Sequence, residues 1–313
     1  MACTPIILAN AEVRDEFIAE GMRQLLRGAS AGDVAERIAC AVEDDPDEHT
    51  VGYGGWPNIL GEVELDASFM DGAARRAGAV AALKGYRHPI SIARQVMLRL
   101  PHVLLVGDGA ARFAAEIGAE RRDMLSPEAR LAWMDRLAEV GDAQGQGTID
   151  LAMRALRQPL GSDTMNVIVR DAAGNLCSAV TTSGIAWKYP GRVGDSPLIG
   201  AGNYCDNRYG AAACMGLGEA AIRVGASLQA VMLLRLGWPL EAAGREVARQ
   251  LSELLDEPSD GDHMRRADWV RLLMMDARGG VGAFATRPGL SFKVQTADDP
   301  QPVISEATWV NQR

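Results

Sequence analysis

Residues 164–184 form the most restrictive pattern in the chain. The run TMNVIVRD is rich in β-branched residues, the turn sequence AAGN follows it, and LCSAVTTSG completes a second such run. Two β-rich runs joined by a short Gly/Asn turn predict a β-hairpin. The preceding stretch, 142–163, begins with small polar residues and ends at Pro159 and Gly161, which indicates a surface linker around a short helical piece. A chain can be cut in such a linker without unfolding.

The rest of the chain mixes helical and strand patterns, as an α+β domain does. Apolar spacing predicts helices near residues 13–28, 90–100, 109–118, 127–141 and 239–255. Ser30, with Asp33 three residues later, is expected to cap another helix. β-rich runs predict strands near 5–10, 65–71, 102–107, 268–276, 281–286 and 290–296. The segment from Tyr209 is expected to start as a strand and continue as a helix after Gly218.

Charge and apolar content exclude several classes of partner. The formal net charge is −9 and no run is rich in Lys and Arg, so nucleic acid is not expected as a partner. No stretch approaches the roughly 20 apolar residues that span a membrane, and the N-terminus lacks the basic start of a signal peptide. The five cysteines show no CxxC spacing and are expected to be reduced. These features predict a cytoplasmic enzyme that does not bind membranes.

The common hydrolase schemes lack their residues in this chain. The four histidines, at 49, 88, 102 and 263, lie in acidic, proline-adjacent or charged contexts that favour structural or solvated roles. This leaves little support for a Ser-His or Cys-His pair. Neither an HExxH motif nor a Cys/His cluster indicates a metal site, and no cofactor is expected. An enzyme of this sequence would need a nucleophile that works without histidine.

A threonine with a free α-amino group meets that need. The amine has an ordinary pKa of about 8 and can accept the hydroxyl proton near neutral pH. Thr164, after Asp163, stands at the boundary between the loose linker and the hairpin. Many threonines at the start of a strand are simply good β formers. Position alone therefore leaves both interpretations of Thr164 open.

Longer motifs carry a resemblance over nearly the whole chain. The runs are SDTMNVIVRDAAGNL, TTSG, PGRVGDSPLIGAGNYCDN and AACMGLGE, preceded by VGYGGWPNILGEVELDASFMDG and HVLLVGDGAARFA. In this order they resemble the glycosylasparaginase branch of the N-terminal-nucleophile asparaginase/isoaspartyl-peptidase family. The resemblance implies a four-layer αββα sandwich and autocatalytic cleavage between Asp163 and Thr164. Residues 1–163 would form an α fragment and 164–313 a β fragment of one structural domain, paired as a homodimer of such heterodimers.

The same resemblance assigns roles to individual residues. Thr164 matches the nucleophile, and Thr182 matches the threonine that hydrogen-bonds it. In the GRVGD loop, Arg192 matches the residue that grips the substrate's α-carboxylate, and Asp195 matches the partner of its α-ammonium. Gly194 belongs to the same substrate-binding loop. The backbone N–H of a further glycine, Gly216, matches a donor of the oxyanion hole.

Two positions depart from this branch of the family, and a third lies in a loop that borders the substrate pocket. Met215 stands where the family usually has a threonine that donates a second hydrogen bond to the oxyanion, and a thioether has no hydrogen to donate. Glu12 stands near the place of a pocket tryptophan, and an acidic residue there would disfavour anionic leaving groups. Trp56, in GGWPN, belongs to a loop that borders the pocket in the family; the alternative is a tryptophan packed on the surface.

These features leave three functional hypotheses. The first is an amidohydrolase of N4-substituted asparagine, because an Asp-Thr pair at the cleavage site is typical of glycosylasparaginases, whereas the other branches typically carry Gly-Thr. The second is an isoaspartyl dipeptidase or L-asparaginase, which shares every catalytic residue. The third is a low-activity or inactive homologue that binds an amino acid, for which Met215 is the only support.

Overall fold

The hairpin predicted at 164–184 lies at the centre of the larger of two β-sheets. In the computed structural model, which describes residues 3–141, 147–157, 164–256 and 269–310, its strands are β5 (Met165–Arg170) and β6 (Leu176–Thr182). They pair antiparallel, with Met165 opposite Thr181. Every residue of both strands is buried, because helices cover one face of this sheet and the second sheet covers the other. This explains their long apolar runs.

The larger sheet interleaves strands from both halves of the chain in the order β12-β11-β1-β5-β6-β2-β3-β4. Its other strands are β1 (Ile6–Asn10), β2 (Leu65–Asp71), β3 (Arg76–Leu83), β4 (Leu104–Val106), β11 (Ser291–Thr296) and β12 (Val303–Glu306). The second sheet has the order β13-β10-β9-β8-β7. Its strands are β7 (Asn203–Asp206), β8 (Gly210–Gly216), β9 (Val270–Asp276), β10 (Val281–Ala285) and β13 (Thr308–Trp309).

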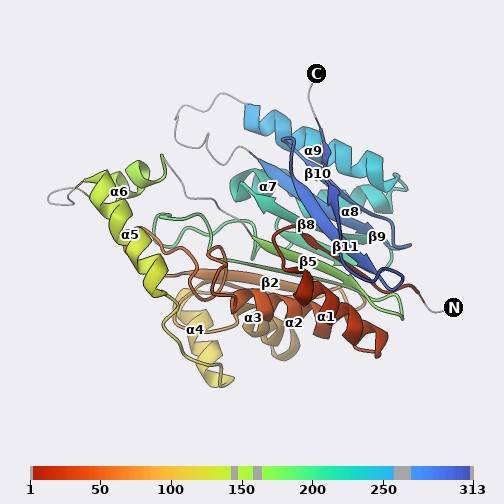
Figure 1. Ribbon diagram of the computed structural model, residues 1–313, viewed down its shortest axis with the longest axis horizontal. Helices are drawn as coiled ribbons and strands as arrows, with labels where there is room; N and C mark the ends of the chain where they lie inside the picture. The colour runs from red at the N-terminus through yellow and green to blue at the C-terminus, as the bar shows by residue number, and fades with distance from the viewer. Residues whose placement is uncertain (1–2, 142–146, 158–163, 257–268, 311–313) are drawn as a thin grey trace.

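Helices cover the outer face of each sheet, which gives four layers (Figure 1). The larger sheet is covered by α1 (Asp15–Leu26), α2 (Ala31–Glu43), α3 (Pro89–Arg99) and α4 (Gly107–Glu116). The second sheet is covered by α7 (Gly218–Val224), α8 (Ala226–Arg235) and α9 (Leu240–Asp256). A third apolar cluster, which includes Leu8, Ile168 and Leu273, fills the space between the sheets. The expected αββα sandwich is therefore confirmed.

Two further helices project beside the layers and precede the central hairpin in the chain (Figure 1). They are α5 (Pro127–Val140) and α6 (Thr148–Ala155), and α6 is the short helical piece expected in the linker. Leu151 and Ala155 of α6 pack with Ile59 and Trp187 in a small separate core. The Asp163 side of the predicted cleavage site lies outside the described residues.

Most of the predicted elements are confirmed, and the exceptions have identifiable physical causes. The Ser30 hydroxyl accepts a hydrogen bond from the Asp33 N–H at 3.2 Å, as expected of a helix cap. The helix predicted after Gly218 is two helices, because Gly225 between them has a left-handed φ of +65°. Strand β3 was not predicted, since its alanine-rich sequence has little of the β-branched character that marks a strand.

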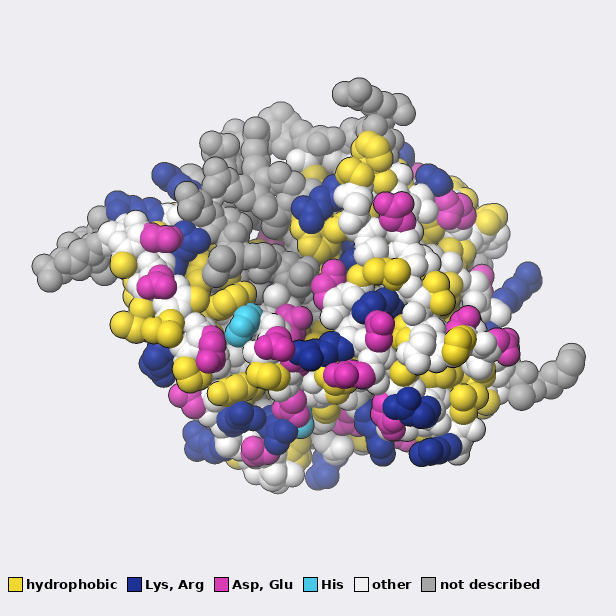
Figure 2. All heavy atoms as spheres, in the orientation of Figure 1, with side chains coloured by type: hydrophobic (Ala, Val, Ile, Leu, Met, Phe, Trp, Pro, Cys, Tyr) yellow, Lys and Arg dark blue, Asp and Glu magenta, His cyan; other side chains and the backbone are white. Residues whose placement is uncertain are grey.

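The described surface is mixed in charge. On the face shown in Figure 2, Lys and Arg side chains are interspersed with Asp and Glu among the described residues and form no continuous basic stripe. Among the described helices, none combines the length and the apolar character that crossing a membrane requires.

Candidate active site

Thr164 and Thr182 meet at the end of the central hairpin. The Thr164 hydroxyl lies 3.4 Å from the Thr182 hydroxyl, and both residues are buried. The Thr182 hydroxyl accepts from the Gly184 N–H at 3.0 Å and lies 3.4 Å from the carbonyl oxygen of Thr50. These contacts fix the orientation of Thr182. The structure therefore brings together the predicted nucleophile and its predicted hydrogen-bond partner.

Arg192 is held at one edge by a carboxylate that the sequence interpretation did not include. Its Nε and Nη2 donate to the two carboxylate oxygens of Glu219 at 2.9 and 2.8 Å. Such a bidentate pair fixes the plane of a guanidinium. Gly194 lies against the guanidinium, where a Cβ would come within 3.0 Å of Nη1 and within 3.3 Å of Cζ and Nη2. The edge that contains Nη1 is the one that could receive a substrate carboxylate.

Asp195 lies close to Arg192 and is almost fully buried. Burial raises the pKa of its carboxyl group to about 7, while the nearby charge of Arg192 acts in the opposite direction. A buried carboxylate of this kind gains most from a cationic partner that enters the site, because such a partner offsets the cost of removing the charge from water. Asp195 is thus suited to the α-ammonium group expected from the sequence.

Gly216 ends strand β8 above the hairpin and faces the same cavity as Thr164. Its φ is +110°, and a Cβ there would lie 2.2 Å from the carbonyl oxygen of Trp269. Only glycine fits this position without displacing the neighbouring strand. The cavity is lined by Thr164, Thr182, Gly184, Ile185, Arg192, Gly194, Asp195, Ser196 and Gly216.

Met215 and Glu12, the two unusual residues, are joined through Arg271. The Met215 Sδ accepts from Arg271 Nε at 3.1 Å and from Nη2 at 2.6 Å. Arg271 Nη2 also contacts Glu12 Oε2 at 2.7 Å. Glu12 is therefore one member of an ion pair, whereas the sequence showed only an isolated acidic residue. Met215 does not line the cavity among the described residues.

Trp56 packs against two other aromatic rings. Its ring centroid lies 4.6 Å from that of His49 and 5.9 Å from that of Trp187. The described lining of the Thr164 cavity does not include it. The geometry favours the alternative of a packed loop tryptophan over a pocket residue.

A buried cluster of charged residues, Lys188, Glu64 and Asp66, lies next to the site. It was not identified from the sequence. Lys188 Nζ donates to the carbonyl oxygen of Glu64 at 3.1 Å, and the Glu64 carboxylate accepts from the Gly191 N–H at 3.1 Å. Asp66 pairs across the sheet with Thr182. Burial raises the pKa of Asp66 and lowers that of Lys188, while their mutual attraction opposes both shifts. The cluster ties the loop before Arg192 to strand β2.

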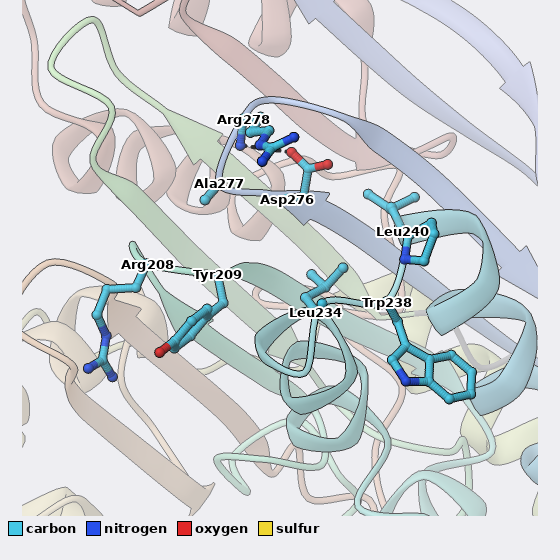
Figure 3. Close-up of a pocket in the computed structure, with 10 residues that line it drawn as sticks. Arg208, Tyr209, Leu234, Trp238, Leu240, Asp276, Ala277 and Arg278 are labelled. Atoms are coloured by element: carbon cyan, nitrogen blue, oxygen red, sulfur yellow. Dashed lines mark hydrogen bonds between the residues drawn. The ribbon is translucent and has the colours of Figure 1, made fainter.

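Another described cavity is larger than the Thr164 cavity. It has a volume of about 430 Å³ and lies at the other end of the second sheet, where side chains from three turns surround it (Figure 3). Gly210 and Gly216 are the two ends of β8, so the two cavities are roughly 20 Å apart. The Asp276 carboxylate at the larger cavity is used by its own turn, where it accepts from the N–H groups of Arg278 and Gly280. Among the described residues that line the larger cavity, Tyr209 alone carries a hydroxyl group, so this lining has no pair of hydroxyls like that of Thr164 and Thr182.

The fold and the threonine pair define the chain as a hydrolase of the N-terminal-nucleophile type. Comparison with known proteins gives the family: residues 8–259 match the family described as Asparaginase. The chain belongs to this asparaginase family and is an amidohydrolase of asparagine or isoaspartyl substrates.

Curated relatives cover three activities within this family. The chain is 36% identical to an N(4)-(beta-N-acetylglucosaminyl)-L-asparaginase of Elizabethkingia miricola, over 93% of this chain and 81% of the relative. It is 34% identical to a plant-type L-asparaginase of Thermococcus kodakarensis, over 91% and 90% of the two chains. It is 40% identical to an isoaspartyl peptidase of Salmonella typhimurium, over 71% and 70%. The relatives establish the family. Because their activities differ in the leaving group, they do not determine the leaving group for this chain.

Proposed function

We propose that Thr164 becomes a new N-terminal residue by cleavage after Asp163 and then hydrolyses the side-chain amide of N4-substituted asparagine, releasing aspartate. The observation that carries this proposal is the contact between the Thr164 and Thr182 hydroxyls in one cavity with Arg192 and Asp195. The family match supports the reaction class.

Self-cleavage needs only groups of the chain and one water molecule. The Thr164 hydroxyl attacks the carbonyl carbon of Asp163, the bond to the Thr164 nitrogen breaks, and that nitrogen takes up the hydroxyl proton. Water then hydrolyses the resulting ester, which leaves a carboxylate on Asp163 and a free α-amino group on Thr164. The new amine has an ordinary pKa of about 8 and can act as the base for its own hydroxyl.

Substrate hydrolysis follows the same chemistry a second time. The Thr164 hydroxyl attacks the side-chain amide carbon, and the negative oxygen that develops is stabilised by the Gly216 N–H. The leaving amine takes the proton from the α-amino group and departs. Water, activated by the same α-amino group, hydrolyses the aspartyl ester. Arg192 and Asp195 hold the α-carboxylate and the α-ammonium group throughout.

The glycosylasparagine type of substrate is preferred because Asp163 precedes the nucleophile, as in that branch of the family. Isoaspartyl dipeptidase or L-asparaginase activity is the second candidate, and the relatives with those names support it. A low-activity homologue that binds an amino acid is the third. A cytoplasmic location and pairing as a homodimer of heterodimers remain predictions from the sequence.

Intact-mass measurement of the purified protein tests the proposal directly. We expect two fragments that separate before Thr164, and one uncut chain for the Thr164→Ala variant. The interleaved sheet, in which β1 lies between β5 and β11, should keep the fragments together under native conditions. Turnover of GlcNAc-asparagine, a β-aspartyl dipeptide and asparagine then ranks the leaving groups. A wild-type chain that stays whole and hydrolyses none of the three would refute the enzyme proposal and favour the inactive homologue.

A further inference from the structure

The nucleophile is flanked by two different strands. On one side, β6 brings Thr182 to Thr164. On the other side, β1 pairs with β5 as far as Ala9 opposite Val167, and the Asn10 side chain then accepts from the Asn166 N–H at 2.7 Å. The turn after Asn10 carries Glu12, so Glu12 lies on the β1 flank of the nucleophile.

The carboxylate of Glu12 is held in place by two donors on one oxygen. Arg271 Nη2 contacts Glu12 Oε2 at 2.7 Å, and Asn10 Nδ2 donates to the same oxygen at 3.0 Å. The Arg271 side chain is fully buried, whereas 36% of the Glu12 side chain is exposed. The member of the ion pair that meets solvent is therefore Glu12, and both printed donors contact its Oε2.

Glu12 also remains ionised at neutral pH. Burial alone would raise the pKa of Glu12, but the charge of Arg271 and the hydrogen bonds from Arg271 and Asn10 outweigh it and hold the pKa below its ordinary value. Arg271 meets the Met215 Sδ and the carbonyl oxygen of Ser291 on its other sides. Arg271 is thus surrounded by acceptor groups of the protein, of which Glu12 is the charged one.

The position of the leaving group follows from the two strands, β6 and β1, that lie on either side of Thr164. This step rests on the proposed function. When the amide carbon is at Thr164, its α-carbon end extends toward Arg192 and Asp195, which follow β6 in the chain. Its oxygen points to Gly216 on the second sheet. The leaving nitrogen is then directed to the remaining side, which is the flank of β1 and Glu12.

We propose that Glu12, positioned by Arg271, selects the leaving group by charge. Its carboxylate accepts hydrogen bonds from neutral or cationic leaving groups, such as glycosylamines, and repels leaving groups that carry a carboxylate. Every isoaspartyl peptide with a free C-terminal residue after the isoaspartyl group releases such an anion. The proposed substrates are therefore asparagine derivatives whose N4-substituent is neutral or cationic.

The test compares two substrates that differ only in this charge, β-aspartylglycine and β-aspartylglycinamide. We expect the wild-type protein to favour the amide by about tenfold in kcat/KM, because solvent and the paired charge of Arg271 leave only part of the repulsion between close like charges. The preference should fall at high salt, which screens a partly exposed charge. In the Glu12→Gln variant the ratio should approach one. N4-(2-aminoethyl)-asparagine, a cationic substrate, should lose activity in the same variant.

Two further variants separate the loss of charge at Glu12 from destabilisation of the protein and from a general effect of removing a carboxylate. Glu12→Gln leaves a buried Arg271 without its partner, which can destabilise the protein. The double variant Glu12→Gln with Arg271→Met removes both charges and should show the same loss of selectivity. Glu241→Gln removes an exposed carboxylate on the distant helix α9 and should leave the ratio unchanged.

Equal ratios in the wild type, Glu12→Gln and the double variant would overturn the inference while leaving the proposed function intact. A wild-type protein that hydrolyses none of these substrates would instead refute the proposed function, and the charge selection with it.

Discussion

Removing the α-ammonium group from the substrate is expected to halve the slope with which the logarithm of kcat/KM rises with pH on the acid side of the profile. The reason is Asp195, whose pKa burial raises to about 7. A substrate with an α-ammonium group needs the ionised carboxylate, whereas a substrate without it does not. The corresponding monoamides of succinic acid lack only this amino group.

The magnitude follows from the two titrating groups. The ionised fraction of a group with a pKa of about 7 is about one tenth at pH 6 and about one hundredth at pH 5. The α-amino group of Thr164, with an ordinary pKa of about 8, must also lose its proton. The logarithm of kcat/KM should therefore rise with a slope of about 2 below pH 6 for the amino substrate, and of about 1 for the succinic monoamide.

The assay is kcat/KM from pH 5 to 9 for both substrates, with activity checked after return to pH 8. The Asp195→Asn variant is the matched control and should give a slope of about 1 with either substrate. Equal slopes for the two substrates in the wild type, or a slope of about 2 that persists in Asp195→Asn, would refute the assignment of Asp195 to the α-ammonium group.

Two further predictions concern Met215 and Glu43. The Met215 side chain contacts Arg271 and does not line the described Thr164 cavity, so Met215→Thr should change kcat and KM little. A folded variant whose kcat rises by about tenfold or more would contradict this, because such a rise requires a hydroxyl that reaches the oxyanion. Burial raises the pKa of Glu43 to about 8, although Thr181 donates to it at 2.6 Å. Because this folded-state pKa exceeds the unfolded value of about 4.5, the stability linked to Glu43 is complete below about pH 4.5 and lost as pH rises through about 8, by about 5 kcal/mol in total. The measurement is the free energy of unfolding in urea from pH 5 to 9, in protein kept uncut by Thr164→Ala. Adding Glu43→Gln should remove the loss of stability at high pH. An identical pH dependence of the unfolding free energy with and without Glu43 would count against the prediction.

Much of the fold could be predicted because its signals are local. The central hairpin depends on β-branched runs and a Gly/Asn turn, and the cap of α2 depends on Ser30 and Asp33 alone. Strand β3 was missed because its alanine-rich sequence carries no strong signal of its own, and its strand conformation depends on pairing with β2 and β4. Its neighbours, and not its residues, decide its conformation.

The candidate site divides in the same way between sequence and tertiary structure. The sequence by itself, through its motifs, marked Thr164, Thr182, Arg192 and Asp195, because short runs of residues carry them. Only the tertiary structure decided what holds them and what faces the leaving group. The clearest case is Glu12, which is 259 positions from Arg271 in the chain yet contacts it at 2.7 Å. The two meet because the turn after β1 in one sheet lies against β9 of the other, an adjacency that no local pattern of residues specifies.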